Sequence, residues 1–414
     1  MPEFLTLLPP ADALNKLLDH IQADPAPERV ETEHALGRVL ISPVYAPHPL
    51  PEFARTTVDG YAVKAADTFG ASESLPVYLE LIGEVPMGAA PEIALTAEKC
   101  LLIHTGGMLP EDADAVVMLE YTQDARPNEM EILRAVAVGE NVIEVGEDVK
   151  EGQEVIPAGT QLRPAEIGGL MALGFTEVSV ARKPKVGILS SGDEVIHPSQ
   201  NPTPGQVRDI NAYTLSTAVE KAGGVAVQYG IISDTYAEMY AAAERAKAEC
   251  DLVVVTAGSS ASTRDLTSQI LDELGQPGVL VHGVNTRPGK PTILAVCDGV
   301  PMIGLPGNPV SALVNTQLFV VPVVKALLGE RVSRPQPRVQ AVLSINLPSQ
   351  AGREDWVPVA LVRPSTSSGE GWLAEPIFGK SNLIFTLSRA DGLLKIPADA
   401  TGLSAGKTVE VYLM

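Results

Sequence analysis

The sequence predicts a multidomain α/β plus β protein. We expect a doubly wound, mostly parallel α/β domain, an inserted small β domain, an N-terminal helical or elongated region and a C-terminal β domain. The 414 residues are 45% hydrophobic, enough for several cores. The 36 glycines and 34 prolines are typical of many turns between short strands. From residue 185 onward, buried strand-like runs alternate with helical stretches, which is the pattern of βαβ units.

The N-terminal elongated domain is expected to be discontinuous, formed by residues 1–45 and 146–180. Apolar residues recur at helical spacing over 11–21, and a second helix is expected from Val30 to Leu40. A cluster of prolines then breaks regular structure. The helical run at 165–175 indicates a return to the first region after an inserted domain.

The residue pattern of each remaining segment predicts the type of domain that it forms. Short β runs such as VYLELIGEV and AVVMLEY, separated by turns, predict an inserted β domain over residues 46–145. Strands such as KVGILSSG and DLVVVTAG, alternating with helices, predict the α/β domain over 181–330. Runs such as RVQAVLSINL and TVEVYLM predict a C-terminal β domain over 331–414.

Charge and composition exclude several function classes. Thirty Lys and Arg against 51 Asp and Glu leave a net charge of −21. A surface that acidic repels phosphate backbones and anionic lipids, so neither nucleic acid nor a membrane is expected as a partner. The three widely spaced cysteines, and the lack of a basic leader or a long apolar run, favour a soluble cytoplasmic protein. No Walker, Gly-x-Gly-x-x-Gly or Gly-x-Ser-x-Gly motif occurs.

Three loops rich in glycine and hydroxyl groups follow predicted strands of the α/β domain. Glycine lets backbone N–H groups approach a ligand, serine adds donors, and a following helix N-terminus favours an anion. Any one loop by itself is more often an ordinary helix cap, but three on one sheet predict a pocket for a phosphate or oxyanion. The candidate residues are Ser190, Ser191, Gly192, Asp193, Gly258, Ser259, Ser260, Pro306, Gly307, Asn308, Pro309 and Ser311.

Carboxylates gather near the same predicted edge of the sheet. They are Glu194, Asp209, Asp234 and Asp265. Oxygen ligands beside phosphate donors suit a hard cation such as Mg²⁺. The alternative is that Asp209, Asp234 and Asp265 are helix N-caps, and the residues alone do not separate the two interpretations.

The turn Arg287-Pro288-Gly289-Lys290-Pro291 is a more specific signal. Two cations held by a Pro-Gly turn lose little entropy when they bind an oxyanion. A solvated basic turn is the alternative, and it is less expected beside the apolar ILAV run. Asp59 and Thr105 add polar groups from the β domain, where on their own they read as turn residues.

The order of these motifs resembles the molybdopterin molybdenumtransferase family, which includes the C-terminal domain of gephyrin. The resemblance runs nearly end to end and rests on a set of motifs. They are VDGYAV (58–63), HTGGMLPEDADAVVMLE (104–120), GEDVKEGQEVIPAGT (146–160), SSGDEV (190–195), RDINAYTL (208–215), RPGKP (287–291) and GLPGNPVSAL (304–313). It implies an α/β domain of the molybdopterin-binding type.

The resemblance also implies a reaction and its participants. The reaction is Mg²⁺-dependent cleavage of adenylylated molybdopterin with insertion of molybdate into the dithiolene. Glu194, Asp234 and Asp265 would be the carboxylates on the Mg²⁺ and nucleotide side. The enzyme would be a homodimer, in which Asp59 and Thr105 reach the site from the partner subunit. The upstream adenylyltransferase is a candidate partner.

Motif matching assigns further residues to the substrate. Asp148 lies in the matched GED motif. Arg287, Lys290, Pro291 and Ser311 fall where the family places molybdate or pterin contacts. Ser381 matches a C-terminal serine that faces the oxyanion.

The chain departs from the family pattern where the oxyanion binds. The first lysine of Lys-Pro-Gly-Lys is Arg287, and a forked donor changes the contact geometry. The second arginine of the C-terminal pattern is Pro358, and Arg353, Arg264 or Arg363 is hypothesised to replace it. A tungstate-preferring insertase and a non-catalytic molybdopterin-binding scaffold remain alternatives.

Overall fold

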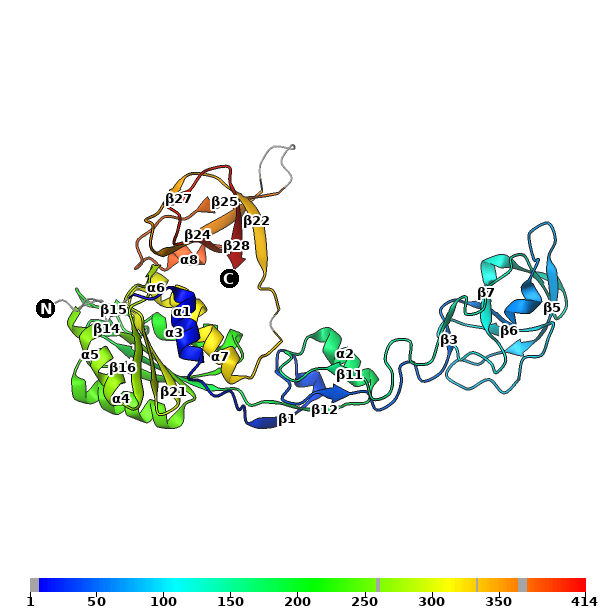
Figure 1. Cartoon of the computed structure of the whole chain (residues 1–414), viewed down its shortest axis with the longest axis horizontal. Coiled ribbons are helices and arrows are strands. Elements are labelled where there is room, and N and C mark those ends of the chain that lie inside the picture. The colour runs from blue at the N-terminus through cyan, green and yellow to red at the C-terminus, as the bar shows by residue number, and fades with distance from the viewer. Residues whose placement is uncertain (1–6, 258–260, 333, 364–370) are drawn as a thin grey trace. The chain divides into compact units, whose positions relative to one another are not determined.

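The computed structural model describes residues 7–257, 261–332, 334–363 and 371–414, and only the backbone of 257 and 261–265. The chain divides into two compact units, whose segments can be followed by colour in Figure 1. Unit 1 comprises Met1–Ser42, Ala158–Arg163 and Glu177–Met414, and unit 2 comprises Pro43–Pro157 and Pro164–Thr176. The finer division into four domains, with the boundaries given above, stays a prediction.

A six-stranded sheet in the order β16-β13-β17-β21-β20-β18 forms the centre of the α/β domain in unit 1. Its strands are β13 (Lys185–Ser191), β16 (Val225–Ile232), β17 (Leu252–Ala257), β18 (Pro277–His282), β20 (Ile293–Cys297) and β21 (Val300–Pro306). The first four strands of this order pair in parallel. β20 pairs antiparallel with both of its neighbours, β21 and β18. Two short strands, β14 (Val195–Ile196) and β15 (Val207–Arg208), follow β13.

Helices cover both faces of this sheet (Figure 1). They are α3 (Asn211–Lys221), α4 (Tyr236–Glu249), α5 (Ala261–Glu273), α6 (Pro309–Asn315), the π-helical η4 (Thr316–Val320) and α7 (Val321–Leu327). One core holds Leu215 of α3 and Phe319 of η4, and the other holds Met239 of α4 and Ile270 of α5. The predicted doubly wound, mostly parallel α/β domain is confirmed.

The continuous helical stretch Pro309–Leu327 is long and apolar enough to cross a membrane by length and composition. Its window is 56% buried. Because Phe319, Val320 and Val323 belong to the core beneath the sheet, we interpret the stretch as a core helix of the α/β domain.

The N-terminal region of unit 1 is less helical than expected. α1 (Pro10–Leu18) forms and buries Ala13 and Leu17 in the α/β core. The helix expected from Val30 to Leu40 is wrong. That segment begins in strand β1 (Pro27–Glu31) and continues as a short 3-10 turn, η1 (Thr32–His34). β1 is a strand because it pairs antiparallel with β12 (Glu177–Ala181), a partner far along the chain.

Unit 2 contains the predicted small β domain. A six-stranded sheet has the order β7-β4-β6-β5-β9-β8. The strands are β4 (Gly60–Val63), β5 (Val77–Glu84), β6 (Lys99–Ile103), β7 (Ala115–Met118), β8 (Thr122–Arg126) and β9 (Glu129–Ile132). The unit also contains β2 (Val44–Tyr45), β3 (Arg55–Thr56), η2 (Ala65–Thr68), η3 (Leu119–Tyr121), β10 (Val142–Ile143), β11 (Glu154–Ile156) and α2 (Pro164–Ala172).

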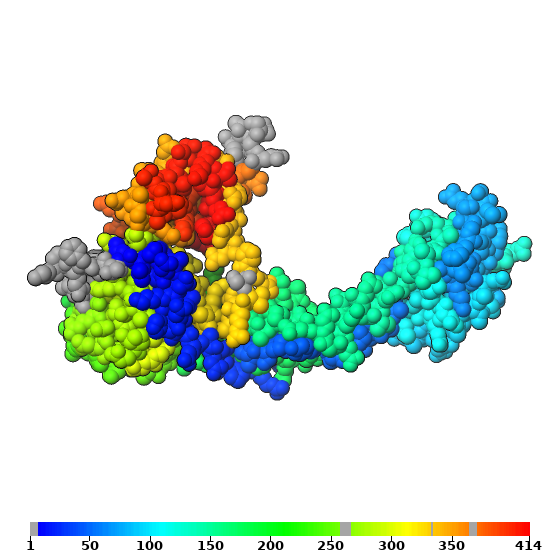
Figure 2. Space-filling model, in the orientation of Figure 1, coloured from blue at the N-terminus to red at the C-terminus, as the bar shows by residue number. Residues whose placement is uncertain are grey.

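The C-terminal β domain belongs to unit 1 and is built on the sheet β19-β24-β25-β22-β28-β26. Its strands are β22 (Arg338–Leu343), β24 (Glu354–Val362), β25 (Trp372–Pro376), β26 (Gly392–Ile396) and β28 (Thr408–Leu413), with β23 (Leu347–Pro348), β27 (Gly402–Leu403) and helix α8 (Phe385–Ser388) beside them. The edge strand β19 (Thr286–Arg287) comes from the α/β domain and pairs in parallel with β24. The space-filling view in Figure 2 shows this domain in orange and red, beside the α/β domain.

Candidate functional site

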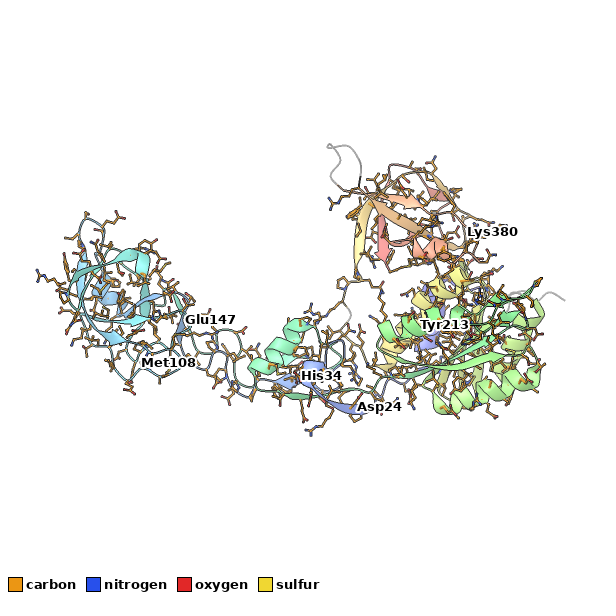
Figure 3. All side chains as sticks on the ribbon, turned by 180° about the vertical axis from the view of Figure 1, so that it is seen from behind. Asp24, His34, Met108, Glu147, Tyr213 and Lys380 are labelled. Carbon is orange, nitrogen blue, oxygen red and sulfur yellow. The ribbon has the colours of Figure 1, made fainter. Side chains whose placement is uncertain are left out.

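A pocket of about 1100 Å³ lies in unit 1, lined by the α/β domain and the C-terminal β domain. Nine sequence-predicted residues line it: Arg287, Gly289, Lys290, Pro291, Pro306, Asn308, Ser311, Arg353 and Ser381. Lys380, labelled in Figure 3, adds a cation that the sequence did not single out. Among the described residues, no carboxylate forms an ion pair with Lys290 or Lys380. Unpaired cations in so acidic a chain favour an anionic ligand.

The basic turn at the floor of this pocket is held by a buried asparagine. Asn315, which is fully buried, donates from Nδ2 to the Gly289 carbonyl oxygen at 3.0 Å and to Thr292 Oγ1 at 2.6 Å. Gly289 has φ +102°, and a Cβ there would lie 1.9 Å from that Nδ2. This close packing holds the backbone between Arg287 and Lys290. A polar side chain within the apolar run ALVNTQLF was the available sequence signal for Asn315.

The C-terminal domain contributes a loop that contacts the start of α6. The Val310 backbone N–H donates to the Ser381 carbonyl oxygen at 3.0 Å. This bond places residue 381 beside Ser311 at the pocket wall, although the two positions are distant in sequence. Ser381 therefore lies on the pocket lining, and its contact with an oxyanion stays a prediction.

A buried carboxylate lies in the same wall. Asp355 on β24 is only 4% exposed, and its Oδ1 accepts from Arg353 Nε at 2.8 Å. Its Oδ2 accepts from Ser349 Oγ at 2.9 Å and lies 3.9 Å from Arg287 Nη1. Arg287 and Asp355 are register partners in the β19–β24 pairing, which is why a basic and an acidic residue meet here. Nothing in the sequence pointed to Asp355, because its partner is set by a strand pairing between domains.

A second group of predicted residues lies at the ends of β13 and β16. Asp193, Glu194 and Asp234 follow these two neighbouring parallel strands. Burial raises the pKa of Asp234, the nearby Ser191 hydroxyl and the Asp193 backbone oppose the rise, and the negative charges of Asp193 and Glu194 add to it. Asp234 Oδ1 and Ser191 Oγ are buried without a hydrogen-bond partner in the described part of the chain. These hard oxygen donors suit a divalent cation.

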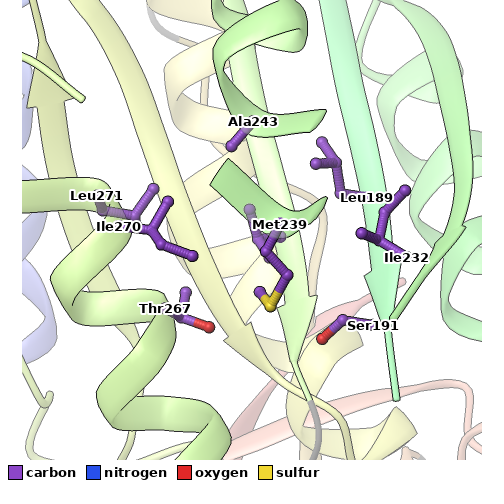
Figure 4. A pocket seen from close by; sticks show the side chains of 9 residues that line it. Leu189, Ser191, Ile232, Met239, Ala243, Thr267, Ile270 and Leu271 are labelled. Atoms are coloured by element: carbon purple, nitrogen blue, oxygen red, sulfur yellow. The ribbon is translucent and has the colours of Figure 1, made fainter. Parts of the chain in front are cut away.

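A small cavity of about 10 Å³, room for about one water molecule, lies next to this group. Figure 4 shows the hydroxyl groups of Ser191 and Thr267 turned towards it, with Met239 and Ile270 among the apolar residues around them. Since most of its lining is apolar, the cavity belongs to the core beneath the carboxylates and is not itself a ligand site.

The remaining α/β residues divide between capping and undescribed segments. Asp209 Oδ1 accepts from the Ala212 backbone N–H at 3.1 Å at the start of α3, as in the capping alternative. Asn211 Nδ2 donates to the Gly307 carbonyl oxygen at 2.8 Å and so joins α3 to the third loop. Gly258, Ser259 and Ser260 lie outside the described residues, as do the side chains of Asp265 and Arg264.

The two groups in unit 1 lie at one edge of the sheet. The pocket lined by Lys290 does not include Glu194 or Asp234. However, β13, β17 and β21 are consecutive parallel strands, and their register puts Ala257 level with Pro306. Two strand spacings separate the ends of β13 and β21 by about 10 Å. A ligand that spans this edge can reach both groups.

Asp59, Thr105 and Asp148 lie in unit 2, and two of them are in contact. The Thr105 backbone N–H and Oγ1 donate to Asp59 Oδ1 at 2.8 and 3.1 Å. These two hydrogen bonds, with His104 nearby, lower the pKa of Asp59. Asp148 is exposed, and its backbone N–H donates to the Leu50 carbonyl oxygen. The motif match assigns Asp59 and Thr105 to one site, and the structure brings these two residues into contact.

Comparison with known proteins accounts for the whole chain. Three family models match: the MoeA N-terminal region (domain I and II) over residues 8–174, a probable molybdopterin binding domain over 187–326, and the MoeA C-terminal region (domain IV) over 340–414. The molybdopterin molybdenumtransferase of Bacillus subtilis is 33% identical over 98% of this chain and 94% of its own length. The chain belongs to the molybdopterin molybdenumtransferase family.

Other relatives agree with this membership. The molybdopterin molybdenumtransferase of Nostoc sp. is 32% identical over 97% of the chain and 92% of that protein. Two crystal structures of the molybdopterin biosynthesis MoeA protein of Pyrococcus horikoshii cover 99% of the chain, and 99% and 100% of their own. Their identities are 36% and 33%, and their TM-scores 0.78 and 0.85. The predicted multidomain fold is therefore the fold of this family.

Proposed function

We propose that this protein transfers molybdenum to molybdopterin, as the last step of molybdenum cofactor assembly. In this proposal the substrates are molybdate and adenylylated molybdopterin, and cleavage of the phosphoanhydride depends on Mg²⁺. The main supporting observation is the pocket with Arg287, Lys290, Arg353 and Lys380 on its lining, in a chain of net charge −21. The relatives named molybdopterin molybdenumtransferase support the same reaction.

The oxyanion would be held by the basic turn and the C-terminal wall. Arg287 and Lys290 would donate from either side of Gly289, while Ser311 of the α/β domain and Ser381 of the C-terminal domain would supply hydroxyl groups. We propose Arg353 as the replacement for the arginine missing at Pro358, because both residues line the pocket. Arg363 is a weaker candidate, since its guanidinium lies over the Trp372 ring at 4.8 Å.

Asp234 and Glu194 would hold Mg²⁺, together with Asp265. The unpartnered Asp234 Oδ1 and Ser191 Oγ fit a hard cation that takes oxygen ligands and keeps some of its waters. When bound, Mg²⁺ would neutralise charge on the phosphate oxygens. The loop after β13 would bind the phosphates through its backbone, and Asp209 and Asn211 would hold the neighbouring helix against that loop.

We further propose a cytoplasmic homodimer. Asp59 and Thr105 would enter the site of the partner subunit, with Thr105 keeping Asp59 ionised and oriented. Cys100, Cys250 and Cys297 are buried free thiols, which supports a reducing compartment. The enzyme that adenylylates molybdopterin is the proposed protein partner, because it would supply the substrate.

Release of AMP tests the reaction. The full chain is incubated with adenylylated molybdopterin, molybdate and Mg²⁺, with E194A as the inactive control and E220A, an exposed carboxylate on α3, as the matched active control. We expect AMP from the wild type and E220A only. Wild-type release no greater than that of E194A would favour the non-catalytic alternative. Replacing molybdate by tungstate in the same assay measures the preference between the two oxyanions.

A further inference from the structure

An acidic side chain stands in the wall of the basic pocket. Asp355 lines the same cavity as Arg287, Lys290, Arg353 and Lys380. A pocket that only attracts anions gains nothing from a buried negative charge. The carboxylate therefore needs an explanation that the proposed binding role does not supply.

The two arginines beside Asp355 are held to different degrees. Arg353 donates through Nε to Oδ1 at 2.8 Å, and its side chain is 29% exposed. Arg287 reaches Oδ2 only at 3.9 Å, with a side chain that is 67% exposed. Arg353 is thus fixed by a charge-assisted hydrogen bond, whereas Arg287 is only loosely attracted. Arg287 can turn to an incoming anion without breaking a hydrogen bond.

We propose that Asp355 is an internal counter-anion that sets the affinity of the pocket for its oxyanion. This inference rests on the proposed function, in which the pocket binds molybdate. Before the substrate arrives, Asp355 offsets part of the positive charge of the two arginines. The oxyanion then competes with Asp355 for Arg287 while it is repelled by the same carboxylate. Affinity is therefore kept below what four cations alone would produce.

The size of the effect follows from the geometry. An oxyanion hydrogen-bonded to Arg287 would lie about 7 Å from the Asp355 carboxylate, since one hydrogen bond adds about 3 Å to the 3.9 Å separation. For a dianion at that distance, even in water-like surroundings, removal of the carboxylate charge strengthens binding about tenfold. A purely structural residue has the opposite signature, because its loss weakens binding or leaves it unchanged.

Asp355→Asn in the full chain is the decisive variant. Asparagine removes the charge and keeps one oxygen to accept from Arg353 Nε, while its amide nitrogen replaces Oδ2 and can donate to the Ser349 hydroxyl oxygen. Isothermal titration calorimetry is expected to show that D355N binds molybdate about tenfold more tightly than the wild type does. The gain should shrink in a D355N/R287Q double variant, because Arg287 is the cation released by the substitution.

Glu354→Gln is the matched control. Glu354 is the adjacent residue on β24, is also largely buried, and pairs with Lys395 at 2.7 Å without lining the pocket. E354Q makes the same change in net charge and should leave molybdate affinity within about twofold of the wild type, because the charge it removes is already paired away from the pocket. An equal gain in E354Q would overturn the inference, since it would show an effect of overall charge.

Unchanged or weaker binding by D355N also refutes the inference. Should D355N fail to fold, Asp355→Ser removes the same charge with a smaller side chain, and the same outcomes apply to it. The two proposals fail differently. A wild-type protein that binds no molybdate refutes the proposed function, whereas wild-type binding without a gain in D355N refutes only the role of Asp355.

Discussion

Substitution of Gly289 by alanine should destabilise the α/β domain and disrupt the basic turn together. Gly289 has φ +102°, and its added Cβ would lie 1.9 Å from Asn315 Nδ2 and 2.7 Å from Asn315 Cγ. Asn315 cannot move away freely because it is fully buried and donates two hydrogen bonds. The substitution therefore combines backbone strain, overpacking and a broken buried hydrogen bond.

The magnitude can be worked from these parts. Left-handed backbone at a residue with a Cβ costs roughly 1 kcal/mol. Overpacking and the lost hydrogen bond each add about 1 kcal/mol at the low end of their ranges. The sum is about 3 kcal/mol, which lowers the unfolding midpoint of the α/β domain by about 6–12 °C. Molybdate affinity should fall as well, because Arg287 and Lys290 flank the displaced residue.

Gly299→Ala is the matched control for G289A. Gly299, in the turn between β20 and β21, also has a positive φ of +88°, but nothing lies within 4 Å of its added Cβ. G299A should therefore lose only the free energy of backbone strain, about 1 kcal/mol, and its unfolding midpoint should fall less than that of G289A. Scanning calorimetry of both variants isolates the clash. In an N315A background, G289A should lower the stability less than it does in the wild type, because the clashing side chain is gone. Equal losses of stability in G289A and G299A would refute the reasoning.

Three further predictions concern single side chains. Because the pKa of Asp234 is raised in the folded protein, ionisation of this carboxyl lowers the stability of the fold as pH rises through that pKa. D234N should therefore keep or raise the thermal midpoint at pH 7, and a lower midpoint would contradict this. Mg²⁺-dependent AMP release by D234N should fall at least about 100-fold. T105V should raise the pKa of Asp59 part-way to its usual value in an NMR titration of labelled aspartates, because the backbone hydrogen bond remains. Burial raises the pKa of Cys100 to about 12 and of Cys297 to about 11, so Ellman's reagent at pH 8 should modify both only after denaturation, and rapid reaction in the native protein would count against their burial.

Residue periodicity was enough to predict most of the elements. The apolar runs ending at Ser191 and Ala257 form strands because they are buried on both faces, and that requirement is visible in the sequence itself. The helix predicted from Val30 to Leu40 is wrong, because apolar spacing does not reveal that the start of this segment pairs with β12. The pairing partner decided the outcome.

The candidate site was predictable where its residues are adjacent in sequence. The turn from Arg287 to Pro291 carries its own conformational signal through proline and glycine, so its place in the pocket could be anticipated. Asp355 and Asn315 could not be found in this way, because each acts on the turn from a different element. For Asp209 the sequence allows both a cap and a ligand, and its hydrogen bond to Ala212 forms only once α3 is in place.

By itself, the sequence determined the strongly negative charge, the alternation of strands and helices, and a local turn with two cations. These properties depend on composition and on neighbours a few residues away. The tertiary structure alone decided that β19 leaves the α/β domain to pair with β24 and so brings Arg287 to Asp355. Contacts of that kind join segments far apart in the chain, and their free energy comes from backbone hydrogen bonds and shared burial that no local pattern records.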